Sequence, residues 1–596
     1  MVDRGRHYTR AGMRICLVTP FSWSQPHEAN DHVAGVAAAL RRRGHDVTVL
    51  APSSRAADLQ SGRRALARGE LTEVVALGLA VPVSRRSSLG VPVGVKANLA
   101  LALREGGFDV VHGIDPGVPS LSYLALLEAE TLTAATFLSV DRLAYPARRA
   151  QRDRLLARID ALLATSDAVA AASAERFPGD YRVLSPGVDT ARYARGRKRD
   201  VIAVEVRANA LAVARAVMRG LRELEGWEVA LVRTTPLATR PTIPLAVRDR
   251  VHVRSLVRPE ARAAVLADAA ILVPAPGGSP RLRLEAMASG CAIADPPGIT
   301  DQPELAAAAV GRLVDDPPFR EREATLARSR AEGESFDALA AELERIYTSL
   351  GPRRRTARST EPLADRDWIV ADLHMHTRWS HDCSVPVPEL LDHAAAEGLG
   401  AIAVTDHNAF SGAQEAVRLA RGRDLVVIPG EEVKTKGQGE VIGLFLRQEI
   451  PRGMSFGDTL VAIREQGGLV YLPHPFDRRH AIPDPKTLHR HLAEIDVFEV
   501  YNARLLLETY NDEALRFARK YGLLAGAGSD AHVLQGVGTG ALRMRRFDGP
   551  EEFMLSLRTA EVLRRPRSLA YLQSLKWVAQ VKADRRRRSA KYETST

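Results

Sequence analysis

Two histidines that alternate along one short segment constrain this chain more than any other feature. His374 and His376 follow the apolar residues 369–371. Side chains alternate between the two faces of a strand, so both imidazoles leave the same face, about 7 Å apart. Two imidazoles that converge from one strand end are typical ligands of a metal ion. We therefore expect this segment to begin a metal site.

Similar polar clusters follow other apolar runs downstream, and ten of the sixteen histidines lie between residues 372 and 532. Polar groups gather at the C-terminal ends of parallel strands in barrel active sites. A lone histidine on an apolar face is more often a satisfied core residue, but five clusters in register argue against that interpretation. The clusters that join the two histidines are Asp406-His407, Glu432, His474, and the pair Asp530 and His532.

Composition limits the class of protein. The 596 residues are 45% hydrophobic and 26% charged, which indicates several globular domains. The three cysteines lie far apart and form no CxxC pair, which favours a reducing compartment. We find no signal peptide and no apolar run long enough for a membrane span, and we expect a cytoplasmic protein.

Arginine-rich runs account for part of the net charge of +11 and lie at 353–355 and 585–588. Such runs can bind nucleic acid or an anionic membrane surface, which would make the protein peripheral to the membrane. The alternative is a solvated tail, the more common role of a charge run. No aromatic-rich strand accompanies these runs, as an RNA-binding sheet would require.

Strands and helices alternate along most of the chain, which predicts parallel sheets covered by helices. Residues 351–367 are rich in Pro, Arg, Ser and Thr and are expected to be a linker. Met13 opens the first apolar strand and is an alternative start. The predicted division is a disordered tail (1–12), a first α/β domain (13–184), a second α/β domain (185–350) closed by a helix over 336–350, the linker, a third α/β unit (368–566), and a basic C-terminal helix and tail (567–596).

The third unit resembles the PHP family, the polymerase and histidinol phosphatase domain. The resemblance covers residues 368–566 and implies a distorted (β/α)7 barrel that holds two or three divalent metals, with Glu432 bridging them. The motifs, in family order, are His374-Met375-His376, Ser380-His381-Asp382, Thr405-Asp406-His407-Asn408, Gly430-Glu431-Glu432, His474-Pro475 and Ser529-Asp530-Ala531-His532. The metal-binding and catalytic residues that it implies are His374, His376, Asp382, His407, Glu432, His474, Asp530 and His532.

One position departs from the family pattern. Many members have a histidine three residues before a glycine, and Glu440 takes that place before Gly443. A carboxylate still binds Mn, Fe or Zn, so Glu440 joins the candidate ligands. The nine residues include four carboxylates and five neutral imidazoles. Two divalent ions would neutralise this set and three would leave it about two units positive, which favours a phosphate substrate.

Neighbouring residues complete the predicted site. The expected chemistry is metal-assisted hydrolysis of a phosphoester, with the metals lowering the pKa of bound water. Asp372 and Asp406 are expected to orient imidazoles. Arg504, with Asn502 in the same segment, is a candidate phosphate clamp; alternatively, the arginine only solvates a loop.

The first two units resemble glycosyltransferase family 4, and are nearest to its phosphatidylinositol mannosyltransferases. The resemblance covers residues 13–350 and implies the GT-B fold, two Rossmann-like domains with a nucleotide-sugar cleft between them. The segments that carry it are 13–20, 43–47, 185–189 and 285–290.

Several residues that hold the sugar donor in this family are replaced. The family's Gly-Gly loop, which lets backbone approach the donor phosphates, is here His27-Glu28. Arg207 remains from a diphosphate-binding Arg and Lys pair. Glu285 remains from a glutamate pair and is either a donor-ribose ligand or a carboxylate favoured by the helix dipole. The other replacements are Val213 for the lysine, Leu138 for a histidine and Gly277 for the first glutamate.

Three hypotheses follow. In the first, the PHP barrel hydrolyses a phosphorylated small molecule or nucleotide, and a degenerate transferase module serves in binding or scaffolding. In the second, the module is an active nucleotide-sugar-dependent transferase with an accessory PHP domain. In the third, the basic tail makes the chain a nucleic-acid or anionic-membrane binding protein. We favour the first, because the metal-ligand set is complete whereas the transferase set is not.

Overall fold

The computed structural model describes residues 12–84, 87–90, 94–233, 241–255, 258–355, 363–478 and 482–565, together with 568, 574 and 577. These residues form two compact units, one that ends at Gly351 and one that begins at Pro352. The predicted N-terminal tail and the predicted basic C-terminal helix lie almost entirely outside the described residues, so their roles stay predictions. Among the helices that the structure describes, none is long and apolar enough to cross a membrane.

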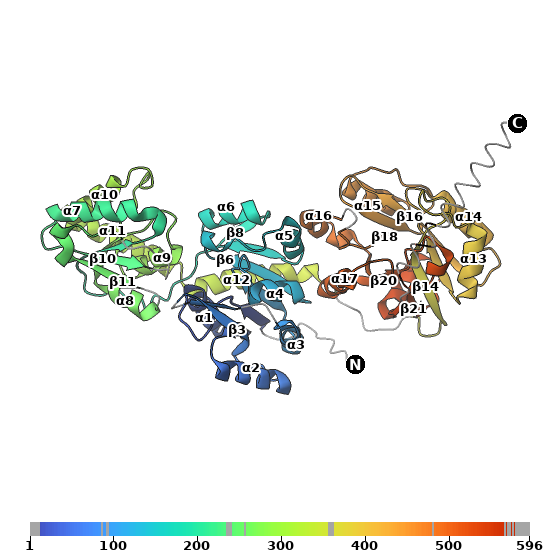
Figure 1. Ribbon diagram of the computed structural model, residues 1–596, viewed down its shortest axis with the longest axis horizontal. Coiled ribbons are helices and arrows are strands. Elements are labelled where there is room, and N and C mark those ends of the chain that lie inside the picture. Colours follow the sequence, from blue (N-terminus) through green and yellow to red (C-terminus); the bar gives the residue numbers. More distant parts are fainter. Residues whose placement is uncertain are drawn as a thin grey trace. The chain divides into compact units, whose positions relative to one another are not determined.

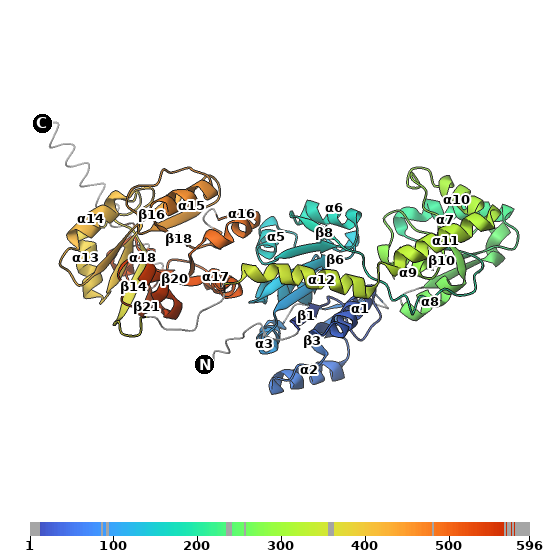
Figure 2. The ribbon, with the colours of Figure 1, turned by 180° about the vertical axis from the view of Figure 1, so that it is seen from behind.

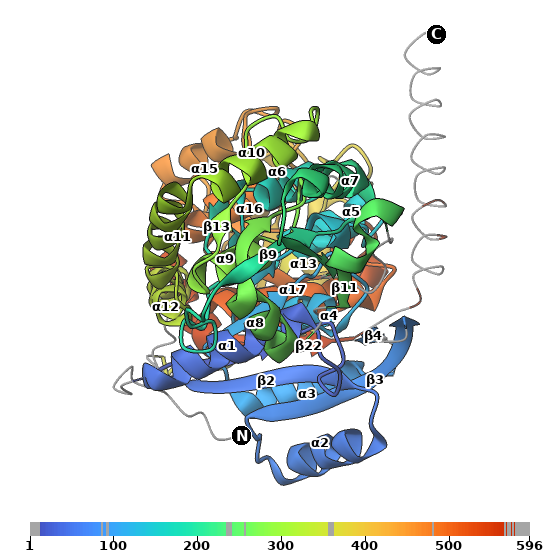
Figure 3. The same ribbon diagram turned by 90° about the vertical axis from the view of Figure 1, so that its left-hand side faces the viewer.

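The first lobe of the first unit is a parallel sheet with one antiparallel edge strand, β4. Its strand order is β4-β3-β2-β1-β5-β6-β7-β8, so the chain starts in the middle and builds outward in both directions. Figure 3 shows β2 and β3 side by side, with α2 next to β3. The strands are β1 (Arg14–Val18), β2 (Asp46–Ser53), β3 (Val74–Ser84), β4 (Ser87–Gly90), β5 (Val110–Ile114), β6 (Leu132–Phe137), β7 (Ala161–Ala164) and β8 (Tyr181–Val183). The helices that precede the second lobe are α1 (Glu28–Arg42), α2 (Ala56–Arg68), α3 (Lys96–Gly106), α4 (Leu121–Glu128), α5 (Arg149–Leu156) and α6 (Asp167–Arg176).

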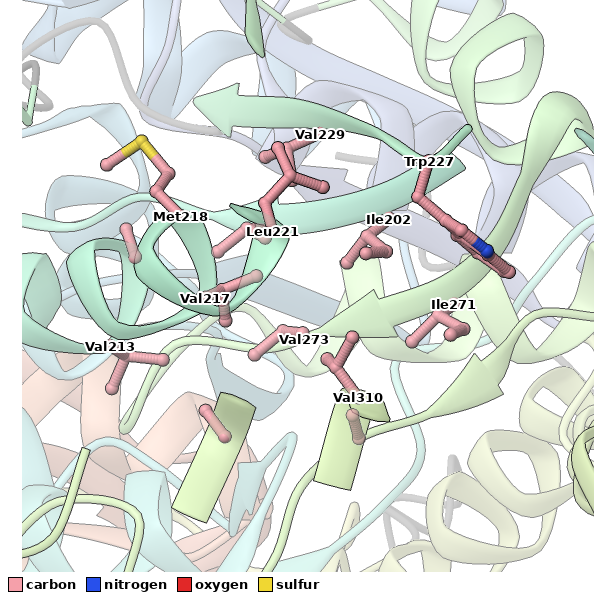
Figure 4. Packing of buried hydrophobic residues seen from close by; sticks show 14 of the residues in the cluster. Ile202, Val213, Val217, Met218, Leu221, Trp227, Val229, Ile271, Val273 and Val310 are labelled. Carbon is pink, nitrogen blue, oxygen red and sulfur yellow. The ribbon is translucent and has the colours of Figure 1, made fainter. Parts of the chain in front are cut away.

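The second lobe is a smaller parallel sheet in the order β11-β10-β9-β12-β13. Figure 4 shows Val213 and Val217 of α7 in one apolar cluster with Ile202 of β9 and Val273 of β12. Val213 is therefore a core residue. The strands are β9 (Arg199–Glu205), β10 (Glu228–Arg233), β11 (Val251–Ser255), β12 (Ala269–Val273) and β13 (Ala292–Ile293). The helices are α7 (Leu211–Gly220), α8 (Pro259–Asp268), α9 (Pro280–Ala288), α10 (Glu304–Asp315) and α11 (Pro317–Glu332). The two lobes confirm the predicted pair of Rossmann-like domains.

The closing helix of the first unit, α12 (Phe336–Leu350), packs on the first lobe rather than on the second, to which the sequence assigned it (Figure 2). Its neighbour is α1, and it buries Tyr347 against His112 of β5. On the outer side, Asp337 accepts from Arg42 at 2.8 Å, and Glu344 pairs with Arg43. The amphipathic stripe of this helix could be seen in the sequence, but the lobe that it covers could not.

The second unit is drawn in yellow to red in Figure 1. Its sheet has nine strands in the order β20-β19-β18-β17-β16-β15-β14-β21-β22. Within it, β17 runs antiparallel to β16 and β18, and β21 runs antiparallel to β14 and β22. The strands are β14 (Trp368–Met375), β15 (Ala401–Val404), β16 (Val426–Lys434), β17 (Glu440–Leu444), β18 (Leu469–Leu472), β19 (Val497–Asn502), β20 (Leu524–Gly528), β21 (Gly540–Arg545) and β22 (Glu561–Arg564). The helices are α13 (Val387–Ala396), α14 (Ser411–Leu419), α15 (Phe456–Glu465), α16 (Pro485–Arg490), α17 (Glu508–Tyr521) and α18 (Gly549–Ser556).

Backbone hydrogen bonds bring the two ends of the β14–β20 sheet together. The Asp530 N–H donates to the His374 carbonyl at 2.8 Å, and the His376 N–H donates to the Ala531 carbonyl at 3.0 Å. The seven strands therefore form a nearly closed barrel, as predicted, with β17 as its antiparallel member. This closure places the segment after β20 directly beside the end of β14.

Replacing Tyr347 with phenylalanine is expected to destabilise the first unit. The Tyr347 hydroxyl lies 2.6 Å from Nδ1 of the buried His112, whose pKa burial lowers to about 3. Without the hydroxyl, a buried ring nitrogen loses its partner, which costs about 1–3 kcal/mol in the free energy of unfolding. Urea unfolding followed by circular dichroism measures this, with Thr348→Ala on the exposed side of α12 as control. An unchanged Tyr347→Phe midpoint would contradict the assigned packing of α12.

Candidate functional site

All nine predicted ligands meet in one cluster of the second unit. Ligand atoms of eight of them fall into four groups of three whose members lie within 4.8 Å of one another. The ninth, Asp382, lies 2.9 Å from His532. The nine are His374 in β14, His376 after it, Asp382 before α13, His407 after β15, Glu432 in β16, Glu440 at the start of β17, His474 after β18, and Asp530 and His532 after β20.

Glu432 lies at the centre of the cluster and is 1% exposed. Its Oε2 lies 3.3 Å from His374 Nε2, 3.4 Å from His376 Nε2 and 3.0 Å from His407 Nδ1. Its other oxygen, Oε1, lies 3.1 Å from His474 Nε2. One carboxylate therefore faces four imidazoles, which is the geometry that a bridging ligand requires.

Further carboxylates lie on two sides of this centre. Asp530 Oδ1 lies 3.3 Å from His376 Nε2 and 3.9 Å from His374 Nε2. On the other side, Glu440 lies 3.9 Å from His407 and 3.8 Å from His474. The carboxylate of Glu440 therefore faces the cluster, so this departure from the family pattern still supplies an oxygen donor.

The arrangement of the ring nitrogens fits divalent cations. His374 Nδ1 lies 3.1 Å from Glu499 Oε1, and His376 Nδ1 lies 3.0 Å from Ser380 Oγ. With these nitrogens engaged, the Nε2 atoms of the two rings face each other at 3.3 Å beside Glu432. Two facing nitrogens can share only one proton, whereas a cation bound between them uses both lone pairs. The donor set of imidazoles and carboxylates suits Mn, Fe or Zn.

Opposite charges within the cluster shift its pKa values strongly. Burial by itself lowers the pKa of His407 and of His474, but Glu432 outweighs this and raises each to about 9. Burial raises the pKa of Glu432, and the neighbouring His407 and His374 bring it well below its ordinary value. The pKa of His376 is held well below its ordinary value by burial and by His532 and His407. The cluster is therefore an ionised carboxylate among imidazoles that differ in basicity.

Two candidate ligands lie in the left-handed backbone region. The φ angle is +26° at His474 and +50° at Asp530, and it is +48° at Asn408, next to His407. Such a conformation costs on the order of 1–3 kcal/mol for a residue other than glycine. Asp530 is held there by its N–H bond to His374, and His474 by an N–H bond of 2.6 Å to Glu499. Glycine would adopt this backbone conformation without the cost. The presence of larger side chains at these positions therefore favours a functional role for them.

The two aspartates that were expected to orient imidazoles bind other groups. Asp372 accepts the backbone N–H groups of His374, Ser529 and Gly538, and so fixes the barrel closure. Asp406 accepts from Thr377 and from the Ser380 hydroxyl, and Ser380 in turn contacts His376. This expectation was wrong for Asp372, and for Asp406 it holds only through Ser380. Glu499 contacts the imidazole of His374 instead. It is a carboxylate of the described residues that lies outside the predicted ligand set.

The candidate phosphate-binding residues lie at the edge of the cluster. Arg504 Nη1 lies 3.2 Å from Asp530 Oδ1 and 3.1 Å from a ring nitrogen of His532. Asn502 is 1% exposed and donates to Glu499 at 3.1 Å. The structure therefore brings Arg504 to the site, whereas Asn502 is enclosed by protein groups. Glu499 itself was missed, although a glutamate inside the apolar run 497–501 was a usable signal.

A pocket in the first unit lies where the nucleotide-sugar cleft was predicted. It is lined by residues of both lobes, which contact each other, for example where Arg262 donates to Asp31 at 3.0 Å. The lining residues that carry charge or hydrogen-bonding side chains are Glu28, His32, Ser139, Thr165, Ser166, Arg207, Ser279 and Arg281.

The chain's own charges are paired around this pocket. The carboxylate of Glu205, 1% exposed, accepts the N–H groups of Ala275 and Ser279 at 3.2 and 3.0 Å, at the loop that precedes α9. Arg207 pairs with Asp141 and lies 4.0 Å from Glu205. A carboxylate of the protein thus occupies backbone donors of the kind that bind phosphate in related folds.

The remaining family residues are also engaged. Glu285 lies in the second turn of α9, is 1% exposed, and accepts from Arg262 at 2.7 Å and Arg281 at 2.9 Å. Ion pairing therefore accounts for its burial, rather than the dipole of the helix N-terminus. Glu28, in place of the Gly-Gly loop, pairs with Arg142, which also binds Asp115 at 2.6 Å.

Comparison with known proteins identifies the second unit. The model of the PHP domain matches residues 372–517, and that of the PHP-associated region matches residues 508–562. An uncharacterized protein of Methanocaldococcus jannaschii is 35% identical over 209 residues, which are 33% of this chain and 83% of that protein. The chain belongs to the PHP family. A solved putative metal-dependent phosphoesterase from Bifidobacterium adolescentis covers 27% of the PHP protein and 87% of its own chain, with 17% identity and a TM-score of 0.24.

The N-terminal part of the PHP protein is similar to a second family. The model of Glycosyltransferase Family 4 matches residues 29–192. The phosphatidyl-myo-inositol mannosyltransferase of Propionibacterium freudenreichii is 34% identical over 189 residues, 30% of this chain and 48% of that enzyme. The chain therefore spans about half the length of this relative. A glycosyltransferase structure from Rickettsia africae covers 58% of the chain and 99% of its own, at 13% identity and a TM-score of 0.40.

Metal binding to the PHP domain is expected to release protons at neutral pH. His407 and His474 have pKa values of about 9, so both rings are protonated on both nitrogens and positively charged at pH 7. A metal binds only the neutral ring, so each must lose one proton. Apparent affinity should rise with pH and level off above about 9, where proton release disappears. Calorimetric titration with Mn²⁺ in buffers of different ionisation enthalpy counts the protons, and His252→Ala, in the first unit, is the control. Proton release that is absent at pH 7 would contradict the assigned pairing with Glu432.

Proposed function

We propose that the PHP domain is a metal-dependent phosphoester hydrolase, a phosphatase or phosphodiesterase. The observation that carries this proposal is the buried carboxylate of Glu432, which faces four imidazoles with Asp530, Asp382 and Glu440 around them. Two or three divalent ions, Mn, Fe or Zn, would act there as Lewis acids and lower the pKa of a coordinated water. These residues of the chain would hold and orient the ions.

Charge then favours an anionic substrate. Four carboxylates and five neutral imidazoles are balanced by two divalent ions and left about two units positive by three. Arg504 adds a guanidinium beside Asp530 and His532, and a quarter of its side chain is exposed. Its N–H groups suit the equatorial oxygens of a phosphate. Phosphorylated small molecules and nucleotides both fit this description.

Phosphate release from a panel of phosphomonoesters and diesters by the Mn²⁺-loaded full chain tests the proposal. His374→Ala is expected to lose more than about 100-fold in rate, since even the outer partners of metal ligands are worth 10- to 100-fold. His252→Ala, a partly exposed histidine of the first unit, is the matched control and should keep the wild-type rate. Release that persists in His374→Ala, or no release with metal confirmed bound, would reject the hydrolase.

We infer that the family 4 module is a scaffold or binding module without transferase activity. The paired charges of Glu205, Arg207 and Asp141 support this, because they use the donors and the cation that a nucleoside diphosphate would need. The position of Glu205 also leaves little space beside this loop. Its carboxylate is so close to Gly278 that even a Cβ at that position would lie 2.1 Å from Glu205 Oε2. Pro280 at the start of α9 further lacks the N–H that could bind a phosphate.

Binding of UDP, GDP and pyrophosphate to the full chain, measured by calorimetry, tests this inference. The wild type is expected to bind none of them measurably. Glu205→Gln removes the anion from the backbone donors, and Asp141→Asn in the same chain removes the partner of Arg207, so pyrophosphate binding should appear in this double variant. If the wild type instead released a nucleoside diphosphate from a nucleotide sugar, and did so equally with His374→Ala, the module would be a working transferase with an accessory PHP domain.

A further inference from the structure

Glu499, in β19, makes an unusually complete set of contacts beneath the metal-binding cluster. It is 1% exposed, and all its hydrogen-bond partners are groups that donate or can donate. Oε1 lies 3.1 Å from His374 Nδ1 and accepts from the Tyr471 hydroxyl at 2.9 Å. Oε2 accepts from the His474 N–H at 2.6 Å and from Asn502 Nδ2 at 3.1 Å. Each oxygen therefore serves two donors, and a carboxylate is the side chain that can accept from all four.

The protein makes room for this contact. In β20, a Cβ at Gly528 would lie 2.3 Å from the His374 Cβ and 3.0 Å from Glu499 Oε1. The absence of a side chain there lets His374 and Glu499 approach each other. The Tyr471 hydroxyl stays protonated, because burial and Glu499 raise the pKa of Tyr471 well above its ordinary value. Tyr471 therefore donates and cannot take over the role of Glu499.

The position of the His374 proton follows from these contacts. Both ring nitrogens of His374 face a buried carboxylate oxygen, Nδ1 that of Glu499 at 3.1 Å and Nε2 that of Glu432 at 3.3 Å. Nε2 is the nitrogen that also faces the candidate ligands His376 and Asp530, so a metal bound there would use the Nε2 lone pair and leave the ring proton on Nδ1, toward Glu499. In the neutral ring, Nε2 is then unprotonated and faces Glu432 and His376. The second contact of Glu499, with the backbone of His474, helps to hold that residue at its φ of +26°.

We propose that Glu499 is the positioning residue that fixes the tautomer and orientation of His374 and the backbone of His474 for metal binding. This inference rests on the proposed metal-dependent function. Glu499 acts through these two histidines, because both of its oxygens are engaged by protein groups.

The variant Glu499→Gln separates this role from simple packing, because it keeps the shape of the side chain. The amide has one accepting and one donating end, whereas four donors surround it. With its NH₂ toward His374, the ring must accept at Nδ1 and carry its proton on Nε2, which removes a metal ligand. With its NH₂ toward His474, the backbone N–H of that residue loses its acceptor. Either orientation weakens metal binding.

The test is calorimetric Mn²⁺ binding to the full chain, with the absorption spectrum of the Co²⁺-loaded protein as a second readout. We expect Glu499→Gln to bind 10- to 100-fold more weakly and to show an altered Co²⁺ spectrum. The matched control is Tyr471→Phe, which removes another donor to the same oxygen without touching His374; it should change affinity less than about threefold. Wild-type affinity in Glu499→Gln, or an equal loss in Tyr471→Phe, would overturn the proposal.

A measurement on the wild type covers the case in which Glu499→Gln does not fold. In the Zn²⁺-loaded protein with ¹⁵N-labelled histidine, the ring of His374, assigned by its loss in His374→Ala, should show a protonated Nδ1. Protonation at Nε2 would overturn the proposal. Failure of the wild type to bind any divalent ion would instead reject the proposed function. Metal binding with wild-type affinity in Glu499→Gln would reject only the role of Glu499.

Discussion

The hydrogen bonds that join the end of β14 to the segment after β20 are the constraint on which the candidate site depends. They bring Asp530 beside His374 and His376, although more than 150 residues separate them in the sequence. Asp372 secures this closure through three backbone N–H groups. Without it the barrel would be an open sheet, and its first and last ligands would lie at opposite edges. The metal-binding cluster is thus a product of barrel closure.

Much of this cluster could be predicted from the sequence, because its ligands follow apolar runs and a strand directs alternate side chains to one face. Glu440 also faces the cluster as expected. The contacts of Glu499, Asp372 and Asp406 could not be predicted, since they join positions far apart in the chain; Glu499 and His374 are 125 residues apart. In the same way, the apolar stripe of α12 indicates that it is buried but not on which lobe.

The PHP domain and the N-terminal module differ in how their charges are satisfied. Around Glu432, imidazoles and carboxylates converge on shared positions, where a cation would complete their coordination. In the cleft of the family 4 module, Glu28 pairs with Arg142, Arg207 with Asp141, and Glu285 with two arginines. These charges of the described cleft residues are therefore engaged within the protein. The contrast is one of electrostatics rather than of fold, because the described residues of the module form both Rossmann-like sheets.

The return of α12 to the first lobe makes the second lobe an insertion with adjoining ends. The outgoing segment at Val188 and the incoming segment at Phe336 are hydrogen-bonded to each other, Val188 N–H to Glu334 and Phe336 N–H to Val188. A chain cut at both points would leave ends close enough for a short turn to rejoin them. The first lobe, including α12, therefore has the topology of a separable domain. The second lobe is a continuous insertion, and its gain or loss would leave the chain path of the first lobe unchanged.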